Sequence, residues 1–595
     1  MCPPRLSPLH HTAMRGNLIL TQLLLSQEGL DLNIRDLQKC TPLHMAATYG
    51  HRQVFQTLRE AGADMLLLDD KDQTVLHKAC QEGHWDILED ILVSMEDDED
   101  KQAELVRGKD VDGNYSVLLA TMAGSNRDQL DEFMKEAFIK GGTFGMLDES
   151  NNQKECPLHY SARAGDTDLV EVLLDNGATI DVQNSFGQTP LYLAADNVNH
   201  LEGEDIHTVD LRLLELLVER GASLDITDTN GLTPIMTAAM KGHLPVVKLL
   251  LEAEASLMER DLKEQNILHL AAQQNRHEVI AVLLEGREGE VLALIKAPDQ
   301  IENTALHVAA ASGSLETVRE LLKEAYAADV DQKNWDEQTA CHLAATNGHS
   351  DVLALLLQHD PSAIFDRDED DNTPLHLAAL NKHCQAVEML LAAGASVQKR
   401  NRQEWTALDC AASAGGRRCC AALLDNGSDL DPLDRSRLTP LHLAAKIGHP
   451  KVVQLLLDRG ASVSCEDKNG YNALELAIRE GNRCVVEALL NCSQWQKALK
   501  TVHTVKNSRL EFVPDTPMRM LIRRFPDLAE HVFDKCITEK ENDVDFDFQF
   551  IDDTYSLKKV IKLEDEITFK YKKESNNEEE TVIETYDRHG TVRLI

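Results

Sequence analysis

One pattern of hydrophobic and polar positions recurs along most of the chain, and the stretch TPLHLAAKIGHPKVVQLLLDRG (439–460) contains all of it. Thr439 and Pro440 predict a helix start, because threonine caps helices and proline at the first position loses no hydrogen bond. The two alanines of the heptad allow a neighbouring helix to approach closely, and Gly448 should end the helix. The apolar residues of VVQLLL recur at spacings of three and four, which predicts a second helix with one buried face.

The first seven residues of this pattern occur in fourteen copies, 33 to 44 residues apart and most often 33. The copies are SPLHHTA (7–13), TPLHMAA (41–47), TVLHKAC (74–80), SVLLATM (116–122), CPLHYSA (156–162), TPLYLAA (189–195), TPIMTAA (233–239), NILHLAA (266–272), TALHVAA (304–310), TACHLAA (339–345), TPLHLAA (373–379), TALDCAA (406–412), TPLHLAA (439–445) and NALELAI (472–478). A single helix pair exposes its apolar face, so stacking of neighbouring pairs must supply the core. The pattern therefore predicts an all-α solenoid of about 14 helix-turn-helix repeats over residues 1–492.

The heptad and its period resemble the ankyrin repeat. This resemblance covers residues 1–492 and implies a repeat array that binds partner proteins on its concave face. The longer intervals contain the acidic run 95–100 and the segment 197–210, which are predicted to be loops on one face.

Histidines and aspartates of the array are considered as metal ligands, because these residue types bind metal ions in proteins. His44, His376 and His442 occupy one slot of the heptad, and a histidine that recurs with the fold is predicted to hydrogen-bond the preceding threonine and the local backbone. Asp366, Asp368 and Asp370 match the start of a calcium-binding loop. The required glycine and glutamate are replaced by Asp371 and Leu377, so a polar inter-repeat turn is predicted.

The stretch DTPMRMLIRRFPDLAEHVFDKC (515–536) starts like another heptad but carries large side chains in place of the alanines. It predicts a helix-turn-helix linker within residues 493–540, with Asp515 or Thr516 as cap and Pro526 starting the second helix. Its expected core is Met518, Leu521, Ile522, Phe525, Leu528, Val532 and Phe533. Because of the bulk at 521, 522 and 525, we expect this pair to leave the stack and to pack differently.

Residues 541–595 are predicted to form a short β-rich tail. Val544, Phe546, Phe548 and Phe550 alternate with polar residues, as do Ile567, Phe569 and Tyr571, and alternation indicates strands with one buried face.

Composition narrows the possible functions. The net charge of −40 disfavours nucleic acid as a partner. The 13 cysteines include no C-x-x-C pair, which indicates free thiols in the cytoplasm and no metal site. No apolar run is long enough to span a bilayer. No catalytic or cofactor motif is present, so we expect neither an enzyme nor a bound cofactor.

The order of array, CSQWQKALK (492–500), helix pair and DFDFQF (545–550) resembles the cytosolic N-terminal half of transient receptor potential channels of the ankyrin subfamily. The resemblance ends near residue 551. It implies part of a calcium-permeable, non-selective cation channel that senses electrophiles or heat, homotetrameric when full-length and located at the cytoplasmic face of the plasma membrane. Because the chain contains no pore, it is expected not to conduct ions by itself. It would be a fragment of the channel, an incomplete gene model or a pore-less isoform.

The same resemblance makes Cys536 a candidate electrophile-sensing cysteine. Lys535 would lower the thiol pKa, whereas Asp534 and the carbonyl end of the helix would raise it. A small residue filling the linker core is the alternative for Cys536. For the whole chain, the alternative is a soluble ankyrin scaffold that binds protein partners.

Overall fold

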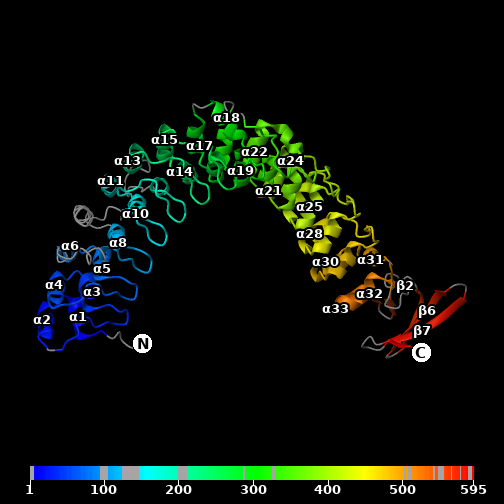
Figure 1. Ribbon diagram of the computed structural model, residues 1–595. Coiled ribbons are helices and arrows are strands. Elements are labelled where there is room, and N and C mark those ends of the chain that lie inside the picture. The colour runs from blue at the N-terminus through cyan, green and yellow to red at the C-terminus, as the bar shows by residue number, and fades with distance from the viewer. Residues whose placement is uncertain are drawn as a thin grey trace. The chain divides into compact units, whose positions relative to one another are not determined.

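The computed structural model describes residues 6–27, 29–93, 105–123, 147–197, 211–285, 288–323, 328–501, 503–506, 512–540, 543–546, 555–563, 566–575, 578–586 and 592–594. The chain divides into two compact units, Met1–Gln300 and Ile301–Ile595. Both units are built from stacked helix pairs (Figure 1). Among the described helices, none combines the length and the apolar character that crossing a bilayer requires.

The first unit contains the first eight heptads, each at the start of a helix. Its helices are α1 (Pro8–Arg15), α2 (Leu18–Leu25), α3 (Pro42–Thr48), α4 (Arg52–Glu60), α5 (Val75–Gln81), α6 (Trp85–Val93), α8 (Ser116–Ala123), α10 (Pro157–Ala164), α11 (Thr167–Asp175), α12 (Pro190–Asp196), α13 (Arg212–Glu219), α14 (Pro234–Lys241), α15 (Leu244–Glu252), α16 (Ile267–Gln273), α17 (His277–Leu284) and α18 (Glu288–Lys296). Each heptad helix packs against the next one along the chain, from α1 through α16. The expected loop 95–100 and all but the first residue of 197–210 lie outside the described residues.

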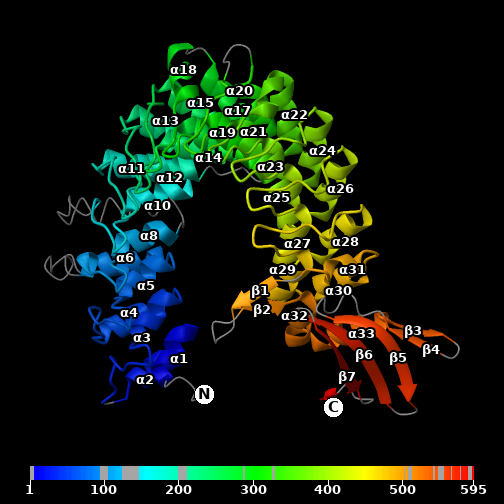
Figure 2. The same cartoon turned by 90° about the vertical axis from the view of Figure 1, so that its right-hand side faces the viewer.

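The second unit continues the same architecture with the remaining six heptads (Figure 2). Its helices are α19 (Ala305–Ser312), α20 (Leu315–Leu321), α21 (Ala340–Asn347), α22 (Ser350–His359), the 3₁₀ helix η2 (Pro361–Phe365), α23 (Pro374–Leu380), α24 (Cys384–Ala392), α25 (Ala407–Ala414), α26 (Arg417–Asp425), α27 (Pro440–Ile447), α28 (Pro450–Asp458), α29 (Ala473–Glu480), α30 (Arg483–Asn491), α31 (Trp495–Ala498), α32 (Pro517–Arg524) and α33 (Pro526–Lys535). Heptad helices α19, α21, α23, α25, α27 and α29 pack in succession, and the second helices α20, α22, α24, α26, α28 and α30 form a parallel layer.

Helix α27 shows why the heptad sequence folds this way. The Thr439 hydroxyl accepts the His442 N–H at 3.4 Å, and Pro440 is the first helical residue. Gly448 ends the helix at φ 101°, a left-handed conformation that glycine adopts without strain. The predicted inward residues are all buried, namely Leu441, Ala444, Ala445, Val452, Val453, Leu455 and Leu456. These predictions for the repeat are confirmed.

Strands follow the last heptad repeat. Strand β1 (His503–Lys506) pairs antiparallel with β2 (Phe512–Asp515), and β3 (Ile537–Lys540) pairs antiparallel with β4 (Asp543–Phe546). A four-stranded antiparallel sheet contains β5 (Tyr555–Leu563), β6 (Glu566–Ser575), β7 (Glu578–Tyr586) and β8 (Val592–Leu594) in chain order. The alternating segment that begins at Val544 enters β4, and its continuation through 547–550 lies outside the described residues. The second alternating segment, 567–571, lies in β6.

The last helix pair corrects one expectation: it does not leave the stack, because α32 packs against α29. Ile522 is 49% exposed, so it is not a core residue and its bulk is not enclosed between α32 and α29. Phe525 is only half-buried and occupies the turn before α33. The other residues of the expected linker core are buried (Met518, Leu521, Leu528 and Val532) or half-buried (Phe533). Large side chains are tolerated here because Ile522 is half exposed and Phe525 lies in the turn between the two helices.

Candidate functional site

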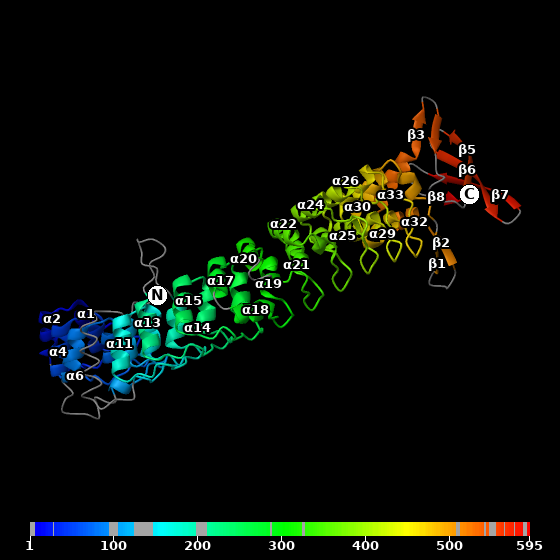
Figure 3. The ribbon, with the colours of Figure 1, turned by 90° about the horizontal axis from the view of Figure 1, so that it is seen from above.

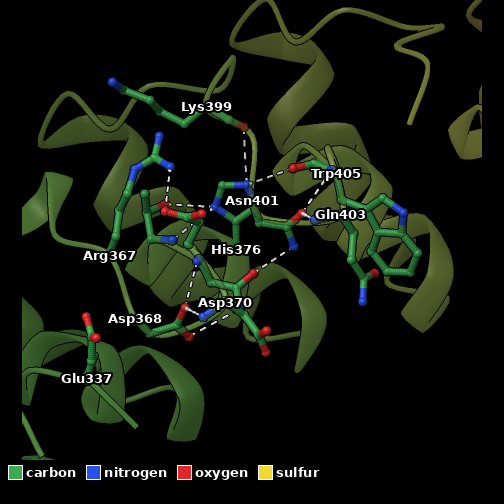
Figure 4. A network of polar contacts seen from close by, with 12 residues as sticks. Glu337, Arg367, Asp368, Asp370, His376, Lys399, Asn401, Gln403 and Trp405 are labelled. Atoms are coloured by element: carbon green, nitrogen blue, oxygen red, sulfur yellow. Dashed lines mark hydrogen bonds and ion pairs between the residues drawn. The ribbon is translucent and has the colours of Figure 1, made fainter. Parts of the chain in front are cut away.

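Each described inter-repeat turn of the second unit is organised by one aspartate or asparagine side chain. In the turn at 366–372, Asp368 Oδ1 accepts the N–H of Asp370 at 3.0 Å and that of Asn372 at 2.7 Å (Figure 4). Equivalent bonds are made by Asn334, Asn401, Asp434 and Asp467. The prediction of a polar inter-repeat turn is confirmed, since Asp368 accepts backbone N–H groups of its own turn.

Neighbouring turns are joined by backbone hydrogen bonds. The residue after the turn-organising side chain donates its N–H to a carbonyl of the preceding turn, as Arg402 does to Asp370 at 2.8 Å and Lys468 to Ser436 at 3.1 Å. The turns project as successive loops from one edge of the helices (Figure 3). We call the donating residues of the second unit the tip row: Trp335, Glu369, Arg402, Arg435 and Lys468. The ladder holds these exposed positions in register.

The heptad histidine joins neighbouring repeats inside the stack. His376 Nδ1 accepts the N–H of Thr373 at 3.2 Å, and Nε2 donates to the carbonyls of Trp405 at 3.1 Å and Lys399 at 3.2 Å (Figure 4). Burial lowers the pKa of His376 to about 4, so the ring is neutral. His44 and His442 likewise accept the N–H of the preceding threonine, and each donates to one carbonyl of the next repeat. The prediction of a structural histidine is confirmed.

Two repeats of the second unit carry a buried carboxyl in this slot, Asp409 and Glu475, and neither was predicted from the sequence. Asp409 is fully buried, and its Oδ2 accepts the Thr406 N–H and the Thr406 hydroxyl, both at 2.8 Å. Its Oδ1 has no hydrogen-bond partner in the described part of the chain. Burial raises the pKa of Asp409 to about 7, against the lowering effect of the Thr406 bonds. The signal was available as the aspartate of TALDCAA, where most other copies have histidine.

The Lys535 ammonium is hydrogen-bonded to the preceding repeat, although Lys535 is adjacent to Cys536 in the sequence. Cys536 is 5% exposed at the end of α33. Lys535 Nζ donates to the Leu490 carbonyl at 2.8 Å and to Asn491 Oδ1 at 2.6 Å, both at the end of α30. The nearby ammonium lowers the pKa of Cys492, although burial of that thiol raises its pKa more. The cation predicted for Cys536 is therefore bonded to the preceding repeat.

Comparison with protein families gives a match to "Ankyrin repeats (3 copies)" over most of the chain. The matched residues are 2–69, 117–203, 207–293, 252–334, 288–368, 306–401, 364–434 and 409–498. The matches together include every heptad except the one at 74–80, and the heptad at 116–122 is covered from residue 117. They end at 498, ahead of the last helix pair.

Individual relatives share only part of their length with the chain. A Caenorhabditis elegans homologue of transient receptor potential cation channel subfamily A member 1 is 27% identical over 277 residues, 45% of this chain and 23% of the relative. A probable E3 ubiquitin-protein ligase, XBOS32 from rice, is 30% identical over 162 residues, 24% of this chain and 31% of the relative. Human palmitoyltransferase ZDHHC13 is 30% identical over 201 residues, 33% of this chain and 29% of the relative. The chain thus matches less than a third of each relative.

Proposed function

Because the chain belongs to the ankyrin-repeat family, we propose that it is a protein-binding scaffold whose inter-repeat turns contact partner proteins. The tip row is the observation that supports this proposal most directly. Its backbone ladder holds the turns rigid, while its side chains are free to vary without loss of the fold. The proposal assigns the chain no catalytic role.

Exposure of a large aromatic side chain supports binding at the turns. Trp335 is 70% exposed, and nearby Ile301, whose carbonyl accepts the Trp335 N–H at 3.1 Å, is 52% exposed. Exposed tryptophan is costly to hydrate and is enriched at the centres of protein interfaces. Neither side chain contributes to the buried core, so the fold itself does not require them.

Co-purification tests the scaffold proposal. The full chain, a Trp335→Ala variant and an Ile447→Ala control are expressed with the same affinity tag. Ile447 is also exposed but lies at the end of α27, outside the turns. We expect a defined set of partners that Trp335→Ala loses and Ile447→Ala retains. Identical sets from all three proteins would refute binding through this turn.

A second candidate is the cytosolic portion of a calcium-permeable, non-selective cation channel, gated by electrophiles or heat at the plasma membrane. It is supported by the similarity to the nematode channel homologue, which at 277 residues extends further than the two other relatives compared. The large side chains of the last helix pair do not support the channel proposal, because α32 packs on α29 as a further layer of the stack. In a full-length homotetramer, α32 and α33 would connect the array to membrane helices.

Transcript sequence past codon 595 tests the channel proposal. Six apolar segments of about 20 residues are expected there, and a scaffold domain in their place would exclude the proposal.

Within the channel proposal, Cys536 with Lys535 remains the candidate electrophile site. Labelling of the folded chain with sub-stoichiometric iodoacetamide, followed by peptide mapping, tests it. Cys341 and Cys410 are matched buried controls, since burial raises the pKa of both thiols. Faster labelling of Cys536 than of both controls is expected, and equal rates would remove it as a sensor.

A further inference from the structure

The tip row of the second unit changes sign along its length. The tip residues 335–337 are Trp-Asp-Glu and 369–371 are Glu-Asp-Asp, whereas 435–437 are Arg-Ser-Arg. Three successive positions of the row, Arg402, Arg435 and Lys468, are exposed cations. A run of cations on one edge stands out in a chain whose net charge is −40.

These cations differ from Lys333 and Arg367, the basic residues of the two preceding turns, which are each paired with an acid. Lys333 Nζ contacts Glu337 at 3.1 Å, and Arg367 Nη1 contacts Asp371 at 3.0 Å. In the described part of the chain, the side chains of Arg402, Arg435 and Lys468 make no hydrogen bond or ion pair. The acids at the base of these turns are engaged with backbone, as Asp434 Oδ1 is with the N–H groups of Ser436 and Leu438. The row therefore presents unpaired positive charge to solvent.

We propose that Arg402, Arg435 and Lys468 bind an extended acidic segment of a partner protein. Stacked helices lie about 10 Å apart, and an extended chain advances about 3.3 Å per residue. One carboxylate at every third residue would therefore meet one cation per repeat. This proposal rests on the scaffold function above and specifies the partner's chemistry.

The surroundings favour a short acidic peptide over a nucleic acid or an anionic membrane. Glu369 precedes the cations in the row, and Glu404 shares a turn with Arg402, so a long polyanion would meet repulsion. Leu433 is 42% exposed beside the row, and the Arg400 guanidinium donates to its carbonyl at 2.6 Å. An exposed leucine offers an apolar contact to peptide side chains that a phosphate backbone cannot use.

A binding experiment with the full chain tests the proposal. The probe is a fluorescently labelled peptide with glutamate at every third position and glycine and serine between, followed by anisotropy. The tip variant is Arg402→Ser, Arg435→Ser and Lys468→Ser together. The control variant removes the same charge from exposed helix positions as Arg417→Ser, Lys446→Ser and Lys451→Ser. Circular dichroism melting checks that both variants remain folded.

We expect the tip variant to weaken probe binding by about tenfold or more, which is about 1.4 kcal/mol, and the control to change it by less than about twofold. A peptide with its glutamates adjacent should bind less well than the spaced one. A second variant with glutamate at 402, 435 and 468 should bind a lysine peptide of the same spacing and reject the glutamate peptide. Equal losses in tip and control variants, or no binding by the unmodified chain, would overturn the proposal.

Two further probes separate the other possible occupants. Tighter binding of a single-stranded oligothymidine, or of vesicles containing phosphatidylserine, with the same loss in the tip variant, would assign the row to nucleic acid or membrane and overturn the peptide proposal. Failure here leaves the scaffold function testable, because its co-purification experiment depends on Trp335. Loss of partners in the Trp335→Ala protein with no acidic-peptide binding would refute this inference alone.

Discussion

Two neighbouring repeats, 373–392 and 406–425, share one fold and carry opposite chemistry in the same slot. In the first, neutral His376 donates across the stack to the carbonyls of the next turn. In the second, Asp409 bonds only to Thr406 and leaves Oδ1 without a partner among the described residues. Burial lowers the pKa of one group and raises that of the other. The comparison teaches that a slot fixed by the fold does not fix how the repeat responds to pH.

Among the substitutions that test this comparison, Asp409→Asn should change the pH dependence of stability most. The folded carboxyl keeps its proton to about pH 7, whereas an unfolded aspartate releases it near pH 4. The stabilisation from the proton is therefore complete below pH 4 and is lost as pH rises through 7. Relative to Asp409→Asn, the natural repeat should lose about 4 kcal/mol over that range, from about three pKa units.

Hydrogen exchange of the amides in α25, from pH 4 to 7, measures the free energy of local opening for this comparison. Arg400 and Asp434 are the charged groups that act on Asp409, and they are unchanged in the variant. Parallel pH curves for the two proteins would show that Asp409 ionises as an ordinary surface carboxyl.

His376→Asn should give the opposite pH dependence. The pKa of His376 is lowered to about 4, and that of an unfolded histidine is about 6.5. Stability from the neutral ring is therefore complete above pH 6.5 and is lost as pH falls through 4, by about 3 kcal/mol relative to the variant. Opening of α23, followed by hydrogen exchange, reports it, and a difference that stays constant from pH 7 to 4 would contradict the buried neutral ring.

The repeat fold could be predicted from the sequence because each copy restates the same local rules. Thr439, Pro440 and Gly448 specify a helix start and end with nearby atoms only, and the recurrence of the heptad supplies the neighbours. The histidine role followed for the same reason. These rules do not single out Asp409, because TALDCAA fits the repeat pattern whichever residue fills its fourth position.

The last helix pair shows where sequence reasoning failed. The sequence gives the size of the side chains at 521, 522 and 525, but their burial depends on how α32 lies on α29. Arg524 also donates to the Arg479 carbonyl, a contact with the preceding repeat that no local rule predicts. The tip row was missed for a related reason, since its members are 33 or 34 residues apart and only the backbone ladder brings them into line.

Asp409→His should convert the second repeat into a copy of the first. The new ring can accept the Thr406 N–H and donate to the next turn, replacing a carboxyl oxygen that has no partner in the described residues. One added buried hydrogen bond stabilises by about 1 kcal/mol at pH 7. Urea unfolding of the full chain at that pH, beside Asp409→Ala as a control that leaves the Thr406 N–H unpaired, measures the gain. Equal destabilisation by histidine and alanine would mean that this slot cannot hold a ring.

The smallest change in the free energy of unfolding is expected for a substitution in the last helix pair. Ile522 occupies the heptad position of Ala379 and Ala412, which are fully buried between repeats. Because Ile522 is half exposed to solvent, Ile522→Ala should change the free energy of unfolding by less than about 0.5 kcal/mol. Leu521→Ala, one residue earlier and fully buried, should cost about 2–5 kcal/mol. Hydrogen exchange in α32 measures both, and a loss at 522 as large as that at 521 would restore the view that bulk at this position is packed inside a core of its own.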